Sequence, residues 1–356
     1  MRIIIVSPSL NTAENVSGIS AVCRFIISNN PKIDYIHFQQ GKKDNERNGL
    51  YRFVSVLTNY KRWIALLKAN RDCIIHFNYP LDYKSIIRDY FFLRYAYIHN
   101  YKMIIHLHGG LYLFKKDKPW IVSRILKIVF DYDVPMIVLS EKEKEHISDI
   151  YQRENVYALP NCIETSDAKR MQRRINNGRL RLLYLGRIEK NKGMDYILRA
   201  LKALNAQGLD FIFRMAGKES IEGEYINKFK DELGDKFEYC GIVSGKSKND
   251  LLVDSDVFVM PSFYEGLPMA MLECMSFGVV PIVTNVGSIC EYVKDGENGK
   301  IVKVMDTDSI VNAIVEVDKG RDLLYRLSAN AQNTIFTKLK VEDYVENLNG
   351  LYEMLL

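Results

Sequence analysis

The chain has 356 residues, of which 47% are apolar and 26% charged, a balance typical of soluble globular proteins, and its length suits two domains. No apolar run approaches the roughly 18 residues of a membrane span, and the first apolar stretch, residues 1–6, ends at Ser7 and Pro8, too early for a signal peptide. The net charge of +5 is unevenly distributed, because residues 1–175 contain 27 Lys and Arg against 17 Asp and Glu, whereas the remainder contains 22 against 27.

In the first half, short runs rich in β-branched and aromatic residues alternate with longer segments of helical character. Strands that are nearly all apolar and separated by helices predict a parallel sheet covered on both faces. The strands are expected at residues 3–6, 33–38, 73–77, 103–107, 136–139 and 156–159, and the helices at about 18–30, 51–70, 82–99, 118–130 and 141–152.

The same alternation restarts after a polar stretch, residues 164–179, which we interpret as a linker. Strands are expected at 180–185, 211–215, 237–239, 257–260 and 280–283. The predicted fold is therefore α/β, with two facing Rossmann-like doubly wound domains at 1–163 and 180–338 and a helix at 339–356 that could pack back on the first domain. Ligands of such sheets bind beyond the carboxyl ends of the strands, so a cleft between the two domains is the expected site.

The six cysteines are scattered, with no Cys-x-x-Cys pair and no histidine at ligand spacing. We interpret them as reduced, mostly buried thiols of a cytoplasmic protein rather than as metal ligands.

The most informative segment runs from Pro261 to Glu273 and follows a predicted buried strand. Pro268 suits the first position of a helix, because its missing N–H is not needed there. Glu265 then lies in the loop before the helix and Glu273 more than a turn inside it, on either side of free helix amides that favour an anion. Carboxylates accept paired hydrogen bonds from vicinal hydroxyls, as a sugar nucleotide offers. The alternative is that Glu265 is a solvated loop residue and Glu273 an ordinary helix-surface residue.

A second cluster, residues 186–193, directly follows the strand at 180–185 and contains Arg187 and Lys192 between two glycines. Two cations in a strand-to-helix turn could neutralise a diphosphate, although the same residues could also form a solvated basic loop. The segment is neither a Walker loop nor a Gly-x-Gly-x-x-Gly fingerprint, which argues against P-loop and adenine dinucleotide chemistry.

Together, the E-x7-E spacing of Glu265 and Glu273, Gly186-Arg187, Lys192-Gly193 and Leu159-Pro160-Asn161 resemble the large retaining glycosyltransferase family 4 of GT-B fold. The resemblance covers essentially the whole chain and is strongest from Leu180 to Glu297.

The resemblance implies that Glu265 contacts the transferred sugar, that Glu273 binds the nucleotide ribose, and that Arg187 and Lys192 hold the diphosphate. It also implies a nucleoside diphosphate sugar donor, UDP- or GDP-linked, retention of the anomeric configuration, and no required metal or other cofactor.

In the N-terminal half, the resemblance places Gly18 of a glycine turn against the phosphates and His108 near the hydroxyls of the donor sugar, whereas we interpret His106 as a core residue. Relatives often have two adjacent glycines near Gly18 and Pro-Asn-Gly where this chain has Pro160-Asn161-Cys162. The predicted catalytic residues are Glu265, His108, Arg187 and Lys192, and the predicted substrate-binding residues are Gly18, Asn161, Gly266, Leu267, Met269 and Glu273.

The favoured function is transfer of a sugar to a saccharide or lipid-linked hydroxyl acceptor, in cell-surface polysaccharide or glycolipid assembly. The alternatives are a non-hydrolysing sugar-nucleotide epimerase of similar fold and a non-catalytic sugar-nucleotide-binding subunit. Nucleic acid is not expected as a partner, because no recognisable module accompanies the basic half.

Residues 61–68 and 115–130 mix cations, tryptophan and aliphatic residues, a composition suited to an anionic membrane surface, although ordinary amphipathic helices share it. Asp254-Ser255-Asp256 and Asp131-Tyr132-Asp133 spell the D-x-D pattern with which another glycosyltransferase fold holds a metal. Both precede their strands, at the amino edge of the sheet, so neither is expected to bind the donor.

Overall fold

The computed structural model describes residues 1–12, 14–41, 50–109, 111–115, 117–171 and 178–356. These residues form two compact units, one of residues 1–162 and 341–356 and the other of residues 163–340. Part of the expected linker, residues 172–177, lies outside the description.

The first unit contains a six-stranded, entirely parallel sheet of order β2-β1-β3-β4-β5-β6. Apart from the exposed Arg2 at the start of β1, every residue of β1, β3 and β4 is buried, and the polar ones among them are Ser7, His76, Asn78 and His106. The strands are β1 (Arg2–Ser7), β2 (Asp34–Gln39), β3 (Ile74–Tyr79), β4 (Met103–Leu107), β5 (Met136–Val138) and β6 (Val156–Ala158).

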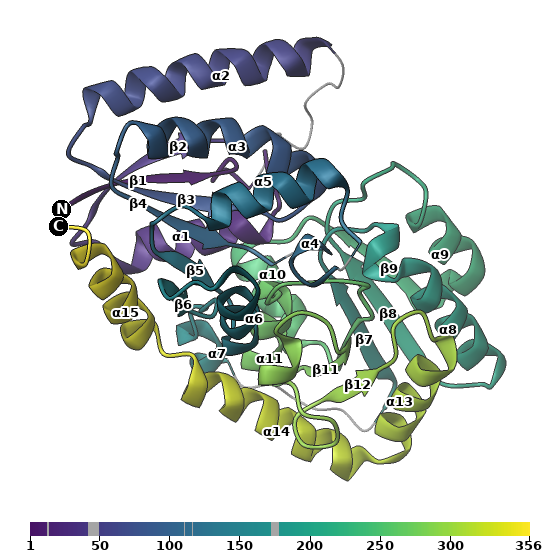
Figure 1. The fold of residues 1–356 in the computed structure, drawn as a ribbon. Helices are drawn as coiled ribbons and strands as arrows, with labels where there is room; N and C mark the ends of the chain where they lie inside the picture. Colours follow the sequence, from purple (N-terminus) through teal and green to yellow (C-terminus); the bar gives the residue numbers. More distant parts are fainter. Residues whose placement is uncertain (13, 42–49, 110, 116, 172–177) are drawn as a thin grey trace. The chain divides into compact units, whose positions relative to one another are not determined.

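Helices connect these strands, and several begin where a side chain caps the free amides of the first turn. Ser17 accepts from the Ser20 amide, Asp82 from those of Lys84 and Ser85, and Ser140 from that of Glu143. The helices are α1 (Gly18–Asn29), α2 (Leu50–Ala69), α3 (Tyr83–Ile98), α4 (Leu111–Phe114), α5 (Trp120–Phe130) and α6 (Glu141–Tyr151). The chain's last helix, α15 (Val341–Glu353), packs beside α1 (Figure 1). The rings of Tyr344 and Phe25 meet edge to face between these two helices.

The second unit repeats the architecture with a parallel sheet of order β12-β11-β10-β7-β8-β9. The strands are β7 (Leu180–Leu185), β8 (Phe211–Ala216), β9 (Phe237–Gly241), β10 (Val257–Met260), β11 (Val280–Thr284) and β12 (Lys300–Val302). The α-helices are α7 (Ser166–Arg170), α8 (Met194–Ala206), α9 (Ile226–Leu233), α10 (Gly245–Val253), α11 (Met269–Ser276), α12 (Ile289–Tyr292), α13 (Thr307–Lys319) and α14 (Arg321–Lys338), with 3-10 turns at Lys190–Lys192 and Gly234–Lys236.

The expected two doubly wound parallel sheets are thus confirmed. Two local expectations were wrong: the edge strand β12 was not anticipated, and Pro268 caps α11, which begins one residue later at Met269. Within the described ranges, no helix combines the length and apolar character that crossing a bilayer requires.

Candidate functional site

The loop between β10 and α11 places Glu265 against the loop between β7 and α8. The Glu265 carboxylate accepts from the Lys192 ammonium at 2.7 Å and from the Ser262 hydroxyl at 2.7 Å. The side chains of Lys192 and Glu265 are only 19% and 12% exposed. Burial alone would lower the pKa of Lys192, but the Glu265 carboxylate outweighs it and the pKa is raised. The predicted diphosphate cation and the predicted sugar-contacting carboxylate therefore form one ion pair.

Backbone contacts fix these two loops against each other. The Phe263 amide donates to the Asn191 carbonyl at 2.9 Å, and Gly193 has a left-handed φ of +82°. A Cβ at Gly193 would lie 2.4 Å from the Pro261 carbonyl oxygen, which is closer than real Cβ contacts allow. Glycine at 193 therefore permits the approach that brings Lys192 to Glu265.

The loop after β11 supports the other side of the Glu265 backbone. A Cβ at Gly287, whose φ is +57°, would lie 2.3 Å from the Glu265 carbonyl oxygen, and the Ser288 amide donates to the Gly266 carbonyl at 3.0 Å. Three strand-to-helix loops at the carboxyl edge of the sheet thus hold the segment that carries Glu265.

Glu273 lies in the second turn of α11 and has its own lysine. The Lys248 ammonium of α10 donates to the Glu273 carboxylate at 2.8 Å, and both side chains are about three-quarters buried. Sequence reasoning missed Lys248, because 25 residues separate it from Glu273 and only the tertiary fold brings the two side chains together.

The other predicted donor-site residues occupy the same edge of the second sheet. Arg187 is half-buried in the loop after β7, where its carbonyl accepts from the buried Tyr184 hydroxyl. Gly266 is half-buried, whereas the side chains of Leu267 and Met269 are buried, so only their backbones could meet a ligand at the start of α11.

In the first unit, Gly18 is the first residue of α1, and a Cβ there would meet nothing within 4 Å. Asn161 follows β6 and is 4% exposed. His108 follows β4, and its Nε2 lies 2.6 Å from the Asn78 Oδ1. Gly110, the second of the two glycines that follow His108, lies outside the described residues.

A row of buried histidines lies behind His108. His106 is fully buried, as expected of a core residue, and its ring lies tilted by 32° against that of His108, with 4.2 Å between the centroids. His106 Nδ1 lies 3.1 Å from His76 Nε2, and His76 Nδ1 lies 2.6 Å from the Tyr352 hydroxyl of α15. Burial, and for His108 also the charge His76 would carry, lowers the pKa of His76 and of His108 to about 3. These imidazoles are therefore neutral at physiological pH.

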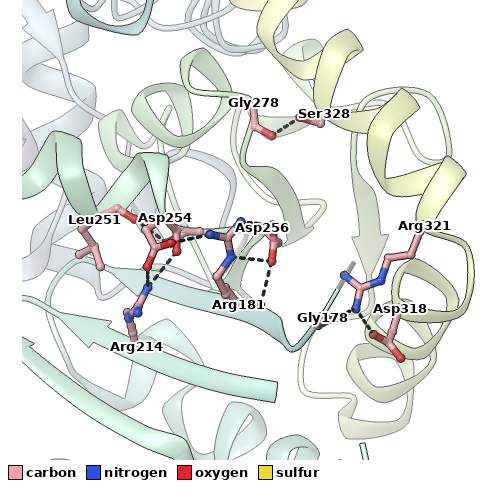
Figure 2. Close-up of polar contacts among 11 residues, drawn as sticks. Gly178, Arg181, Arg214, Leu251, Asp254, Asp256, Gly278, Asp318, Arg321 and Ser328 are labelled. Atoms are coloured by element: carbon pink, nitrogen blue, oxygen red, sulfur yellow. Dashed lines mark hydrogen bonds and ion pairs between the residues drawn. The ribbon is translucent and has the colours of Figure 1, made fainter. Parts of the chain in front are cut away.

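The aspartates before β10, Asp254 and Asp256, form ion pairs with arginines, as Figure 2 shows. Arg181 of β7 binds Asp256 at 2.9 Å and also pairs with Asp254, and Asp254 additionally accepts from Arg214 of β8 at 2.5 Å. Burial would raise the pKa of Asp254, but the Arg214 and Arg181 guanidinium groups hold it below its ordinary value. This D-x-D sequence forms an ion-pair network that joins the amino ends of β7 and β10 to Arg214 in the middle of β8.

The other D-x-D sequence, residues 131–133, also makes a side-chain hydrogen bond, because the Asp133 carboxylate accepts from the Asn155 side chain at 3.2 Å. Among the residues with described positions, no three His, Cys, Asp or Glu side chains gather in a way that could hold a metal ion.

Comparison with known proteins finds a family match within the second unit. Residues 165–334 match the family described as "Glycosyl transferases group 1". The chain is 26% identical to the UDP-Gal:alpha-D-GlcNAc-diphosphoundecaprenol alpha-1,3-galactosyltransferase of Escherichia coli over 61% of this chain and 59% of that protein. It is 26% identical to the lipopolysaccharide 1,2-N-acetylglucosaminetransferase of Salmonella typhimurium over 69% and 65%. The chain thus aligns with less than two thirds of the length of either relative.

Solved structures match nearly the whole chain. Sucrose-phosphate synthase from Thermosynechococcus elongatus superposes with a TM-score of 0.79 over 99% of this chain and 98% of that one, at 15% identity. HepE of Anabaena, solved with UDP and with UDP-glucose, gives 0.74 over 99% and 100%, at 13% and 14% identity. At such identities the likeness shows the fold alone, and that fold is GT-B.

Proposed function

We propose, on the premise that residues 165–334 belong to the glycosyl transferases group 1, that this chain is a retaining glycosyltransferase. It transfers a sugar from a nucleoside diphosphate sugar to a hydroxyl acceptor. The observation that carries the proposal is the Lys192–Glu265 ion pair at the start of α11, because it joins a cation suited to a diphosphate with a carboxylate suited to a sugar.

In this proposal the donor's diphosphate lies between Arg187, Lys192 and the free amides at the start of α11. The bond from the anomeric carbon to the diphosphate oxygen breaks, and the electron pair leaves with the nucleoside diphosphate. The acceptor oxygen forms the new bond on the same face, and its proton is released. Lys192 remains charged, because Glu265 raises its pKa, and so can stabilise the charge that develops on the leaving diphosphate.

Glu265 and Glu273 would bind the two hydroxyl-bearing ends of the donor. Lys192 and Ser262 both donate to Oε1 of Glu265, and Lys248 donates to Oε1 of Glu273. Among the described residues, each carboxylate is therefore fixed through one oxygen, and the other is the proposed acceptor for sugar or ribose hydroxyls. UDP is the favoured nucleotide, since HepE of the same fold was solved with UDP, although a GDP-linked donor fits the same contacts. The proposal requires no metal, because cations of the chain supply the positive charge.

Product analysis tests the function. The purified chain is incubated with UDP- and GDP-linked sugars, with and without a polyprenyl-diphosphate-linked or lipopolysaccharide acceptor. We expect release of nucleoside diphosphate that depends on the acceptor, and an α-linked product from an α-linked donor. An epimerised sugar nucleotide, or a product of inverted configuration, would contradict the proposal.

We further propose that the chain acts at the cytoplasmic face of a membrane, in polysaccharide or glycolipid assembly. The named relatives act on a diphosphoundecaprenol substrate and on lipopolysaccharide. The structure adds a surface that we call the basic face: the outer sides of α2, α3 and α5, in which α3 packs against both neighbours.

The basic face combines exposed cations with exposed apolar side chains. Its exposed large apolar residues are Val54, Leu57, Tyr83, Phe91, Ile98 and Trp120, the last of them 75% exposed. Its exposed cations are Lys61, Arg62, Lys68, Lys84, Arg94, Arg124 and Lys127. The three helices contain a single carboxylate, Asp89, which is buried and paired with Arg88. By contrast, α6 exposes Glu141, Glu145 and Asp149. A face that offers cations and apolar side chains, with no exposed carboxylate within its three helices, suits an anionic lipid surface.

Sedimentation with liposomes tests this location. We expect binding to vesicles that contain phosphatidylglycerol, weaker binding in high salt, and none to phosphatidylcholine alone. Trp120→Ser should weaken binding, whereas Ile150→Ser on the acidic α6, also more than half exposed, should not. No sedimentation with anionic vesicles at low salt would refute the location and leave the transfer reaction untouched.

A further inference from the structure

Lys248 lies in the first turn of α10, where hydrogen bonds on either side of it fix the backbone. The Ser247 hydroxyl accepts from the Ser244 amide at 3.3 Å and donates to the Ser244 carbonyl at 2.8 Å, which closes the start of the helix. The following residue, Asn249, donates to the Asp167 carboxylate of α7 at 2.7 Å. The side chain of Lys248 therefore extends from an anchored turn toward Glu273 of α11.

The stability of α10 does not explain the pair that Lys248 forms with Glu273. A lysine in the first turn lies at the positive end of the helix dipole, which disfavours a cation. The two side chains are 26% and 22% exposed, and ion pairs that water reaches contribute only modestly to stability. Lys246, two residues earlier, pairs with Asp250 within α10 itself. The pair between α10 and α11 is therefore better explained by a ligand that both side chains bind.

The Lys248–Glu273 pair offers a ligand a hydrogen-bond donor and an acceptor side by side. The Lys248 ammonium has three N–H donors, and among the described residues it uses one of them, toward Oε1 of Glu273 at 2.8 Å. The other carboxylate oxygen, Oε2, receives no hydrogen bond from that part of the chain. A hydroxyl both donates and accepts, so a single hydroxyl can donate to Oε2 and accept from Lys248, with both contacts assisted by charge.

The place of the pair along α11 suits the ribose of a nucleoside diphosphate. In the proposed function the diphosphate lies at the start of α11, and Glu273 lies four residues after Met269, about 6 Å farther along the helix. Ribose is directly attached to the diphosphate, and its only free hydroxyls are those at the 2′ and 3′ positions. These two hydroxyls are therefore the groups of the ribose that can meet Oε2 and the Lys248 ammonium together.

We propose that Lys248 is a second ribose-binding residue, which holds Glu273 with one N–H and binds a 2′- or 3′-hydroxyl with another, so that the site selects ribonucleotides over deoxyribonucleotides. The inference rests on the proposed function, in which Glu273 binds the ribose of the donor. A deoxyribose lacks the group that both partners bind and leaves a charged donor and a charged acceptor without it. The substrate class is thus a ribonucleoside diphosphate sugar.

Calorimetric titration of UDP and its 2′-deoxy and 3′-deoxy analogues tests the selection in the unsubstituted protein, with GDP and its analogues in a parallel series. These nucleotides carry no hexose, so the sugar-binding end of the site does not affect the comparison. We expect at least one deoxy analogue to bind at least about tenfold more weakly than its parent. Equal affinities within each series would overturn the selection and leave the donor site intact. Failure of every nucleotide to bind would instead overturn the proposed donor site, and the ribose contact with it.

Substitution of Lys248 tests its own part in this preference. Lys248→Met should weaken binding of the parent nucleotide by about tenfold and that of the discriminated analogue much less, so that the preference nearly disappears. Lys248→Arg keeps the charge and N–H donors and should retain most of the preference. Lys246→Met is the matched control, because it removes the same charge from the same turn, where Lys246 pairs with Asp250 rather than Glu273, and it should leave the preference unchanged. An equal loss for parent and analogues in Lys248→Met, with unaltered circular dichroism, would overturn the role of Lys248.

Discussion

Replacing Lys192 with methionine removes the cation of the Lys192–Glu265 pair and keeps most of the aliphatic volume. Glu265 would then retain only the Ser262 hydroxyl as a donor to Oε1. Removing one partner of a fully buried pair costs about 3–5 kcal/mol, whereas an exposed pair is worth about 0–1 kcal/mol. Because both side chains are less than one-fifth exposed, we expect a loss between these limits, about 1.5–3 kcal/mol.

Urea unfolding measures this loss, provided that the probe reports the second unit. Both tryptophans, Trp63 and Trp120, belong to the first unit, so far-UV circular dichroism is required rather than tryptophan fluorescence. A double-mutant cycle with Glu265→Gln should give a coupling energy of about 1 kcal/mol or more, because the double variant has no unpaired buried charge.

The pH dependence gives an independent check. The pKa of Lys192 is raised above its unfolded value of 10.5, so the stability that the pair contributes is fully present below that value and is lost as pH rises through the folded pKa. The stability difference between the unsubstituted protein and Lys192→Met should therefore shrink in strong alkali. A coupling energy below about 0.5 kcal/mol near neutral pH, or a difference independent of pH, would refute the reasoning.

Three further predictions concern the same unit. Glu265→Gln should mainly lower kcat, while Glu273→Gln should mainly raise the donor KM, by about 1.5–3 kcal/mol in binding energy, and identical kinetic profiles would count against the two roles. Transfer should persist in EDTA and survive Asp254→Asn with less than about a tenfold loss. That variant should nevertheless unfold at lower temperature, because Arg181 and Arg214 lose a carboxylate. Activity abolished by EDTA and restored by Mg²⁺ would contradict the metal-independent mechanism. Gly193→Ala should destabilise more than Gly208→Ala by about 1 kcal/mol or more in urea unfolding, since both positions have positive φ but only Gly193 faces a backbone oxygen at 2.4 Å, and equal losses would show that the loops can separate.

Strands buried on both faces were the most predictable part of the fold. Residues 103–107, 180–185 and 257–260 were predicted with the bounds the structure has, because continuous apolar runs between helices have few other uses in a soluble chain. By contrast, β12 has three residues, begins with Lys300 and lies at the edge of its sheet. Neither its length nor its residue pattern therefore predicts a strand.

The charged residues of the candidate site were named from two short sequence motifs, whereas the residues that contact them only through packing were not. Glu265 and Glu273 share one segment, whereas Lys248 reaches Glu273 only through the packing of α10. Asn78 looks like an ordinary strand residue, since its partners, Val6 and His108, are 72 and 30 residues away. Motif spacing therefore identified charged groups of the candidate site, but not the residues that orient them.

Thermal unfolding with a panel of nucleoside diphosphate sugars most directly tests whether the second unit is a donor site. A ligand at a hundred times its dissociation constant adds about 2.7 kcal/mol to the stability of the folded state. We predict that at least one UDP- or GDP-linked sugar raises the unfolding temperature, that the matching free sugar does not, and that the increase is greatly reduced in Lys192→Met and in Glu273→Gln. An increase that persists undiminished in both variants, or its absence for every nucleotide sugar, would contradict the account.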